Sequence, residues 1–437
     1  MTPENNEYRK RQQQRAAARR RRQAARRRMM IRLGLAALVL IACGLVIWLV
    51  SVEQDNTAAN QPAVSATTPG PNPAQTTPES TEAAVREEKT VIRVAAAGEL
   101  NINDATVAAG KTANGYEYSQ VFLDVMPLLT NADLTVLNLE GNLCGAPYGS
   151  DTASAPQEMM TALADAGVDL VQMANSYSIT NGLLGLSSTL DGIRAAGMEP
   201  LGAYASNEEF RQSQGFTIRE VNGVRLAFVA FTKGMNNLGL PAGSEDCVNV
   251  LYEDYATTYQ DVDQDKINDI LDAVEEAEPD YVIALVHWGS EYNDEPSDTQ
   301  TVIRDLLLER GVDAILGTHP HLVHAVEHDR EAGTFVAYSL GDFFSSTERA
   351  GTNYSVILNL EITRDNRTGE TKLTKYTCTP IYNMTPEESG EEGLRLVRLM
   401  STMEQYDNQL FNRVTKELYD SMGYAMQRVE SRINGNG

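Results

Sequence analysis

Residues 281–292 read YVIALVHWGSEY, and residues 312–321 read VDAILGTHPH. Each stretch begins with an apolar run of the β type and ends in polar residues that carry histidine: His287 in the first, His319 and His321 in the second. In open α/β sheets, residues at the C-terminal ends of neighbouring strands lie at the crevice that binds ligands. Because neutral imidazole is the commonest metal ligand, the two stretches predict an α/β fold with a metal site at its strand ends.

All five histidines of the 437-residue chain fall between His287 and His328. An isolated histidine is more often an ordinary half-buried residue than a ligand. For a His-X-His pair combined with a third histidine at a strand end, a role as metal ligands is the better interpretation. We therefore interpret His287, His319 and His321 as ligands. His324 and His328 are expected on a solvated helix face or on a pocket wall, outside the ligand set.

Strand and helix patterns alternate from about Thr90 onward, as in α/β domains with buried strands. The expected strands are Val91–Ala97, Leu134–Leu139, Asp169–Ala174, Arg225–Phe231, Tyr281–His287, Ala314–Leu316, Thr334–Leu340 and Ser355–Ile362. The expected helices between them are Pro156–Ala166, Leu183–Ala196, Asp263–Glu278 and Thr299–Arg310. The tail has the spacing of amphipathic helices, for example at Leu394–Met403 and Leu410–Leu418.

Residues 1–30 form a strongly basic arm, which we expect in the cytoplasm. Residues 1–32 hold 12 of the 36 Lys and Arg residues but only two of the 60 acidic ones, Glu4 and Glu7. The remainder of the chain therefore carries 24 basic and 58 acidic side chains, a formal charge of −34. A basic run can bind nucleic acid, but its place directly before an apolar segment favours a membrane topology signal, and no nucleic-acid partner is expected.

Residues 31–51 are expected to form a transmembrane helix, because about 20 apolar helical residues span about 30 Å, the thickness of a bilayer core. Arg32 is the only charge and lies at the edge, where its side chain can reach the headgroups. Since the arginines crowd the N-terminal side, we expect a single pass through the cell membrane with the main domain extracytoplasmic.

The two alternatives to this anchor are a cleaved signal peptide and a lipoprotein. A cleaved signal peptide has a shorter apolar core and an Ala-X-Ala-like site, and no convincing site is present. The residues Leu40-Ile41-Ala42-Cys43 resemble a bacterial lipobox, which would make Cys43 a lipidated N-terminus. The apolar run continues from Gly44 to Val50, whereas lipoproteins usually turn polar there, so the transmembrane anchor is preferred.

Composition divides the rest of the chain into three parts. Residues 52–89 are rich in Pro, Thr, Ala and Asn without apolar periodicity, which predicts a disordered linker. Residues 90–383 form the expected main domain, and residues 384–437 the expected C-terminal helical segment. Three cysteines, Cys144, Cys247 and Cys378, lie beyond the anchor and allow at most one internal disulfide, whose pairing the sequence does not define.

Short polar motifs follow the predicted strands in a fixed order. They are Gly98-Glu99, Asn138-Leu139-Glu140-Gly141, Ala174-Asn175-Ser176-Tyr177, His287-Trp288-Gly289, Gly317-Thr318-His319-Pro320-His321 and Tyr338-Ser339-Leu340-Gly341-Asp342-Phe343. This series resembles the CapA family of poly-γ-glutamate capsule biosynthesis proteins over roughly residues 90–383, and its second half is the more specific. The resemblance implies the fold of calcineurin-like metallophosphoesterases, a sandwich of mixed β-sheets flanked by helices.

The resemblance also implies a centre for divalent metal ions, with manganese, iron, zinc and magnesium as candidates. Glu140 would be the bridging carboxylate, and His287, His319 and His321 would complete the metal shell. Two-metal sites activate a water molecule and clamp the oxygens of a phosphate ester. Glu99 stands where the family usually has aspartate, and its longer side chain keeps the charge that a metal ligand requires.

The family's Asn-Asn-His motif is Asn175-Ser176-Tyr177 in this chain. The resemblance thus places Ser176 at the position of an amide metal ligand and Tyr177 at that of the histidine that protonates the leaving group. Serine is a poor neutral ligand, and tyrosine, with an ordinary pKa near 10, is a weaker acid than histidine. Asn175 would supply the missing amide only if the backbone shifted by one residue. Asp342 stands where the family usually has asparagine. Its role would be either to support a metal ligand or to cap a helix.

Two functions of different classes follow from these motifs. One is a non-catalytic component of surface-polymer biosynthesis and export with a degenerate metal site, and the other is an active extracytoplasmic metal-dependent phosphoesterase. Ser176 and Tyr177 favour the first, whereas the retained histidines favour at least one bound metal. The implied partners are the cytoplasmic membrane, other membrane components of a polymer synthase and an anionic surface polymer. A domain of charge −34 repels a polyanion, so direct binding would need bridging divalent cations or a local basic groove.

Overall fold

The computed structural model describes residues 88–346, 349–390, 393–410 and 414–434. Residues Glu87–Gly437 form one compact unit. The expected basic arm, the expected membrane helix at 31–51 and nearly all of the expected linker lie outside the described residues. Among the helices that are described, none combines the length and the apolar character needed to cross a membrane.

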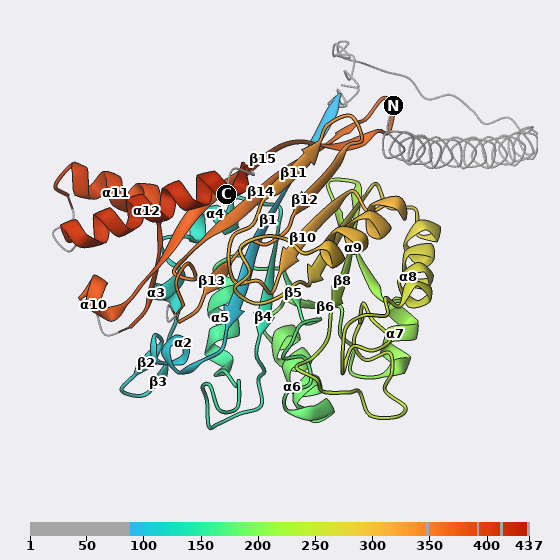
Figure 1. Cartoon of the computed structure of the whole chain (residues 1–437), viewed down its shortest axis with the longest axis horizontal. Coiled ribbons are helices and arrows are strands. Elements are labelled where there is room, and N and C mark those ends of the chain that lie inside the picture. Colours follow the sequence, from blue (N-terminus) through green and yellow to red (C-terminus); the bar gives the residue numbers. More distant parts are fainter. Residues whose placement is uncertain (1–87, 347–348, 391–392, 411–413, 435–437) are drawn as a thin grey trace, which may run out of the picture. The chain divides into compact units, whose positions relative to one another are not determined.

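The first of two main sheets has eight strands in the order β16-β15-β14-β1-β4-β5-β6, with β13 paired to β1 off this path (Figure 1). Strands β1, β4, β5 and β6 are parallel, so their C-terminal ends share one edge of the sheet. The bounds are β1 Lys89–Asn101, β4 Leu134–Glu140, β5 Leu170–Gln172, β6 Glu199–Leu201, β13 Asp342–Phe344, β14 Tyr354–Asp365, β15 Thr371–Met384 and β16 Arg395–Arg398.

The second sheet has six strands in the order β11-β12-β10-β9-β8-β7. Strands β8, β9, β10 and β12 are parallel, and they bring the two histidine-bearing segments to neighbouring strand ends. The bounds are β7 Phe216–Val221, β8 Val224–Thr232, β9 Tyr281–His287, β10 Ala314–Thr318, β11 Val326–Asp329 and β12 Thr334–Ala337. A two-stranded hairpin joins β2 Lys111–Thr112 to β3 Gly115–Tyr116.

Helices cover the sheets (Figure 1), and several of them begin at capping side chains. Helix α9, for example, has a capping box in which the side chains of Ser297 and Gln300 each bond the other's backbone amide. The side chain of Asp263 caps the N-terminus of α8. The bounds are α2 Asp104–Ala108, α3 Ser119–Phe122, α4 Met126–Thr130, α5 Gln157–Asp165, α6 Gly182–Ala195, α7 Asn207–Ser213, α8 Gln264–Glu276, α9 Asp298–Glu309, α10 Pro386–Ser389, α11 Leu399–Asp407 and α12 Lys416–Ile433.

Strand alternation decides where His287 points. One set of β9 residues belongs to the apolar cluster shared with the first sheet: Tyr281, Ile283 and Leu285. The other set packs with residues of α8 and α9: Val282, Ala284 and Val286. Because successive side chains of a strand point to opposite faces, His287 follows Leu285 and faces the first sheet.

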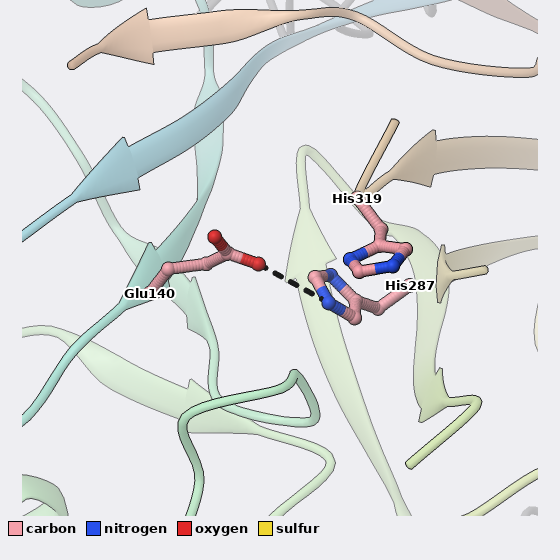
Figure 2. Close-up of side chains that lie close together, drawn as sticks. All are labelled: Glu140, His287 and His319. Atoms are coloured by element: carbon pink, nitrogen blue, oxygen red, sulfur yellow. Dashed lines mark ion pairs between the residues drawn. The ribbon is translucent and has the colours of Figure 1, made fainter. Parts of the chain in front are cut away.

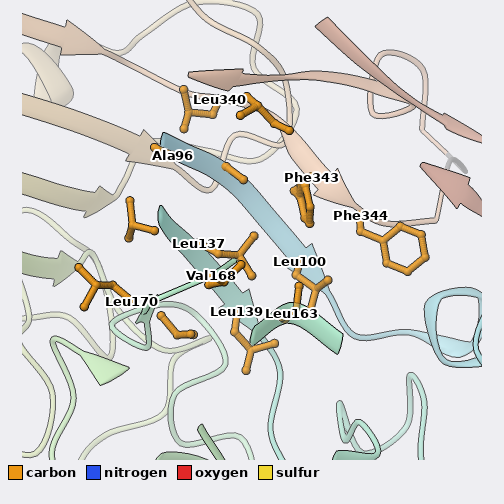
Figure 3. Close-up of a cluster of buried hydrophobic side chains, with 14 of the residues drawn as sticks. Ala96, Leu100, Leu137, Leu139, Leu163, Val168, Leu170, Leu340, Phe343 and Phe344 are labelled. Atoms are coloured by element: carbon orange, nitrogen blue, oxygen red, sulfur yellow. The ribbon is translucent and has the colours of Figure 1, made fainter. Parts of the chain in front are cut away.

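The ends of β1 and β4 are set in an apolar layer that includes Leu100, Leu139, Phe343 and Phe344, all fully buried (Figure 3). Gly98 allows the chain of β1 to approach residue 341 closely, since a Cβ at position 98 would fall 1.8 Å from the Gly341 carbonyl oxygen. That contact lets the Glu99 amide donate to the Gly341 oxygen over 3.2 Å. The carboxylate of Glu99 is thereby fixed at the edge where β1 and β4 end.

The prediction of an α/β protein with mixed sheets flanked by helices is confirmed, and every expected strand and the four helices between them are present. The prediction for the tail was wrong in two places. Residues Arg395–Arg398 form β16 beside β15 rather than a helical turn, because pairing with a long strand provides backbone partners that outweigh a weak helical spacing. The last helix starts at Lys416 rather than at Leu410. Cys144, Cys247 and Cys378 are free, without a disulfide among them.

Candidate metal centre

Five predicted ligands come together where strands of the two sheets end. Glu99 and Glu140 lie at the ends of β1 and β4, His287 ends β9, and His319 and His321 follow β10. Within the described residues, three sets of donor atoms lie within 4.8 Å of one another: Glu140–His287–His319, Glu99–Glu140–His321 and Glu291–His319–His321. Glu140, His319 and His321 each belong to two of these sets, and Glu140 is the member shared by the two sets that are fully buried, as a carboxylate between two metal ions would be.

Glu140 points from the first sheet toward the imidazoles of the second (Figure 2). Its Oε1 atom lies 3.1 Å from Nε2 of His287, and the rings of His287 and His319 have centroids 4.5 Å apart. All three residues are at most 3% exposed. The set therefore offers one carboxylate and two imidazoles to a single buried point.

His287 is held as a neutral ring. Its Nδ1 lies 3.1 Å from the Thr318 hydroxyl, and its Nε2 accepts the amide hydrogen of Ser176 over 3.2 Å. Burial lowers the pKa of His287 well below its usual value, and the nearby charges of His321 and Lys233 act in the same direction. Because the deprotonated ring is the form that binds metal, Nε2 of His287 can bind a cation in place of its hydrogen bond from Ser176.

The loop that carries His319 and His321 has an unusual backbone. The φ angles of these residues are 93° and 61°, in the left-handed region that residues with a side chain rarely adopt. Such conformations cost on the order of 1–3 kcal/mol each and persist where surrounding structure fixes them, often at functional sites. Here the His319 amide donates to Glu99, and the Tyr292 amide donates to the Pro320 oxygen over 3.0 Å.

The second set of donors is strongly acidic. Nδ1 of His321 lies 3.1 Å from Oε2 of Glu99 and 2.8 Å from Oδ1 of Asp342, which also accepts from Asn101 over 3.1 Å. Burial would lower the pKa of His321, but the carboxylates of Glu99 and Asp342 hold it well above its usual value. Asp342 is thus a supporting partner of His321 at the start of β13, and the helix-cap alternative is wrong.

The two glutamates are destabilised as anions in the metal-free protein. Burial raises the pKa of Glu99 to about 7, and the neighbouring charge of Asp342 adds to the shift. Burial also raises the pKa of Glu140 well above its usual value, with repulsion from Glu99 contributing. A divalent cation between these groups would remove both penalties.

Unpartnered donor atoms test whether a metal fits here. Neither ring nitrogen of His319 has a hydrogen-bond partner among the described residues, although the side chain is buried. Oε2 of Glu99 and Oε1 of Glu140 accept no hydrogen bond either, although each lies 3.1 Å from a nitrogen of His321 or His287 respectively. An unsatisfied buried polar group costs about 1–3 kcal/mol, more when charged. Atoms of this kind converging from three strand ends fit a metal centre.

The Asn175-Ser176-Tyr177 segment follows β5 and reaches the centre through its middle residue. Oγ of Ser176 lies 3.0 Å from Nε2 of His287, so the hydroxyl bonds a ligand. The Asn175 amide is used structurally, donating to the Leu139 oxygen over 2.6 Å and accepting from the Tyr177 amide over 2.9 Å. Burial raises the pKa of Tyr177 to about 12, with the charge of Glu140 adding to the effect.

Several residues near the centre were not predicted as part of it. Glu291 is an exposed member of the third donor set, and Thr318 bonds His287. The ring of Tyr292 stacks on His321 with centroids 5.2 Å apart. The signal for Glu291 was its place four residues after His287 in the same motif, whereas nothing in the sequence pointed to the stacking of Tyr292.

His324 and His328 contribute to no donor set among the described residues, as expected. The prediction of a solvated helix face was nevertheless wrong for both. His324 is 1% exposed, with Nε2 2.7 Å from the Asn293 oxygen, and His328 lies in β11 against the rings of Phe335 and Tyr376. His324 and His328 follow His321 by three and seven residues, which is a helical spacing. Pairing of β11 with β12 instead determines the backbone at His328, and the spacing cannot reveal it.

The fold and the site together define an α/β protein of two mixed sheets with a candidate dinuclear metal centre at its strand ends. The profile of the family described as "Bacterial capsule synthesis protein PGA_cap" matches residues 93–347. The chain belongs to this family, and the predicted resemblance to CapA proteins is confirmed.

Two curated relatives carry the CapA name. The chain is 28% identical over 263 residues to "Capsule biosynthesis protein CapA" of Bacillus anthracis, covering 58% of this chain and 60% of that protein. It is 26% identical over 248 residues to "PGA biosynthesis protein CapA" of Bacillus subtilis (strain 168), covering 55% and 58%. The matched region thus spans less than two thirds of either relative.

Solved structures with a similar chain path include a phosphatase from Mycoplasma pneumoniae, with a TM-score of 0.43 and 14% identity over 68% of this chain and 96% of that one. Another is the calcineurin-like phosphoesterase YfkN from Bacillus subtilis, with a TM-score of 0.40 and 15% identity over 67% and 90%.

Proposed function

We propose that this protein is a membrane-anchored, extracytoplasmic component of the machinery that makes and exports a surface polymer, and that it works with a divalent metal bound at the Glu140 centre. Membership of the capsule synthesis family supports the process. The apolar run at residues 31–51 behind an arginine-rich arm supports the anchor. Poly-γ-glutamate is the first candidate polymer, because a relative is named for its biosynthesis.

The observation that carries the metal role is the sharing of Glu140 between two donor sets. Glu140, His287 and His319 would hold one ion, and Glu99, Glu140 and His321 a second. The mixture of imidazole and carboxylate donors suits manganese, iron or zinc better than magnesium, which prefers oxygen ligands and retained waters. Asp342 would orient His321, as second partners of metal-bound histidines commonly do.

A bound pair of such ions would supply Lewis acidity toward a phosphate ester and an activated water. The residues of this chain are less suited to the proton transfer that must accompany bond cleavage. Tyr177, with a pKa raised to about 12, keeps its proton and donates a hydrogen bond more readily than it releases an acid proton. Ser176 directs its hydroxyl to His287 instead of adding an amide oxygen to the donor sets.

The alternative function is an active metal-dependent phosphoesterase. It is favoured by the same shared carboxylate, since a bridged pair of ions is the arrangement that cleaves phosphate esters. Ser176 and Tyr177 instead favour a metal centre that binds its ligand without cleaving it, or cleaves it only slowly. Steady turnover of a generic phosphodiester by the unmodified protein would establish the alternative.

Depletion of the protein in its host should lower the amount of surface polymer, measured as glutamate and sugar released by hydrolysis of washed envelopes. A plasmid copy of the natural chain should restore the polymer. A Glu140→Ala copy should fail, because both donor sets lose a ligand, whereas a His328→Ala copy should succeed. Unchanged polymer after depletion would refute the proposed process, and full restoration by Glu140→Ala would refute the need for the metal.

The topology has a separate test. Protease added to intact protoplasts should remove the main domain and leave the basic arm, residues 1–30, protected inside. A full-length chain that survives this treatment while an external control protein is digested would contradict the topology. Labelling of Cys43 by palmitate would establish the lipobox alternative in place of the transmembrane anchor.

A further inference from the structure

Helix α12 carries an arginine where its pattern calls for an apolar residue. The buried face of α12 consists of Leu418, Met422, Ala425, Val429 and Arg432, at spacings of four, three, four and three residues. This is the stripe by which an amphipathic helix packs against a core. Arg432 is only 7% exposed, and a buried guanidinium is tolerated only with well-placed partners.

The partners of Arg432 are the two loops that form the metal centre. Its Nη1 donates to the Val323 carbonyl over 3.0 Å, two residues beyond His321. Its Nη2 bonds Oδ1 of Asp294, three residues beyond Glu291. One side chain, more than a hundred residues away in sequence, thus joins the loop after β9 to the loop after β10.

These two loops also touch each other directly. The Tyr292 amide donates to the Pro320 oxygen over 3.0 Å, the Tyr292 ring stacks on His321, and the His324 ring lies 2.7 Å from the Asn293 oxygen. The result is that Glu291 lies within reach of His319 and His321, although its side chain is exposed. Such an exposed carboxylate keeps its place only if its loop is held.

We propose that Arg432 is a positioning residue that fixes the loop of Glu291 against the histidine loop, so that the C-terminal helix becomes a structural part of the metal centre. The expected effect of Arg432 on metal affinity rests on the proposed metal role, whereas its expected effect on the loop of Glu291 does not. Arg432 lies beyond residues 93–347, the region that matches the family. The planar guanidinium fork suits this task because it can bond a carbonyl and a carboxylate at once.

The test compares Arg432→Gln with Lys416→Gln in the full-length protein. Lys416 is a matched control, since it lies on the same helix and forms an exposed pair with Asp420. In metal-free protein, hydrogen exchange of the Tyr292 amide should be at least about tenfold faster in Arg432→Gln, while Ile283 in β9 exchanges as before. The Mn²⁺ affinity should fall about 10–100-fold, the usual range for loss of a supporting group. Lys416→Gln should change neither quantity.

Arg432→Lys, which keeps the charge but not the fork, should give intermediate values. If Arg432→Gln does not fold, Asp294→Ala removes the carboxylate partner of Arg432 from an exposed position and should accelerate Tyr292 exchange. Unchanged exchange at Tyr292 in Asp294→Ala, or in a folded Arg432→Gln, would overturn the inference. Natural protein that binds none of Mn²⁺, Fe²⁺ and Zn²⁺ would refute the proposed metal role instead, and the exchange measurement would still decide the role of Arg432.

Discussion

Glu140→Ala is expected to abolish metal binding at both positions, because its carboxylate belongs to both buried donor sets. His287→Ala should empty chiefly the position shared with His319. In the natural protein, metal at a hundred times its dissociation constant should stabilise the fold by about 2.7 kcal/mol for each position it occupies, through binding to the native state alone. Glu140→Ala should lose that entire increment, measured as the shift in unfolding midpoint between metal-containing and chelator-containing buffer.

The matched control for His287→Ala is His328→Ala, which removes a histidine outside the donor sets. His328→Ala should retain the full metal-dependent shift even if the folded state is less stable. In chelator, Glu140→Ala should unfold no earlier than the natural protein, since burial raises the pKa of Glu140 and makes its charge costly there. A metal-dependent shift that Glu140→Ala leaves unchanged would contradict the assignment.

Ser176→Asn combined with Tyr177→His is expected to raise phosphodiester turnover by about 10²–10⁴-fold, the usual value of a positioned general acid. Asparagine would offer an amide oxygen where Ser176 now bonds His287, and histidine would replace a tyrosine whose pKa is raised to about 12. The proton donor is useful only when the metal holds the phosphate beside it. The double change should therefore exceed the combined effects of the single changes.

The measurement is turnover of bis(p-nitrophenyl) phosphate with metal occupancy determined on the same samples. The single variants serve as controls: Ser176→Asn should raise occupancy with little turnover, and Tyr177→His alone should change little. No gain in a double variant that is folded and fully loaded with metal would mean that the centre serves binding rather than hydrolysis. Rapid turnover before any change would mean that another group already donates the proton.

The strand ends that build the site could be predicted because each depends on local pattern. An apolar β run followed by His287 fixes both the strand and the face on which the imidazole lies, since alternation places it with Leu285. The same reasoning placed Glu99, Glu140, His319 and His321 at strand ends. Their convergence was implied by the resemblance to the CapA family, because the parallel arrangement that strand–helix alternation implies gathers strand ends only within one sheet.

Other parts of the site depend on contacts between distant segments that leave no local pattern. Asp342 bonds His321 because β13 pairs with β1 across a register shift at Glu99, which no spacing reveals. Arg432 reads as an ordinary charged residue near the end of a helix until the face it occupies is known. In β16, pairing with β15 likewise outweighs a helical spacing.

Anomalous X-ray scattering from crystals of the purified protein soaked in Mn²⁺ would locate bound metal directly. We expect a peak between the Glu140 carboxylate and the imidazoles of His287 and His319, and a second peak beside Glu99 and His321 that shares Glu140. Two peaks about 3.5–4 Å apart would correspond to a bridged pair of ions. A protein that binds Mn²⁺ only elsewhere, or shows no peak at these residues at saturating metal, would contradict a metal centre at the strand ends.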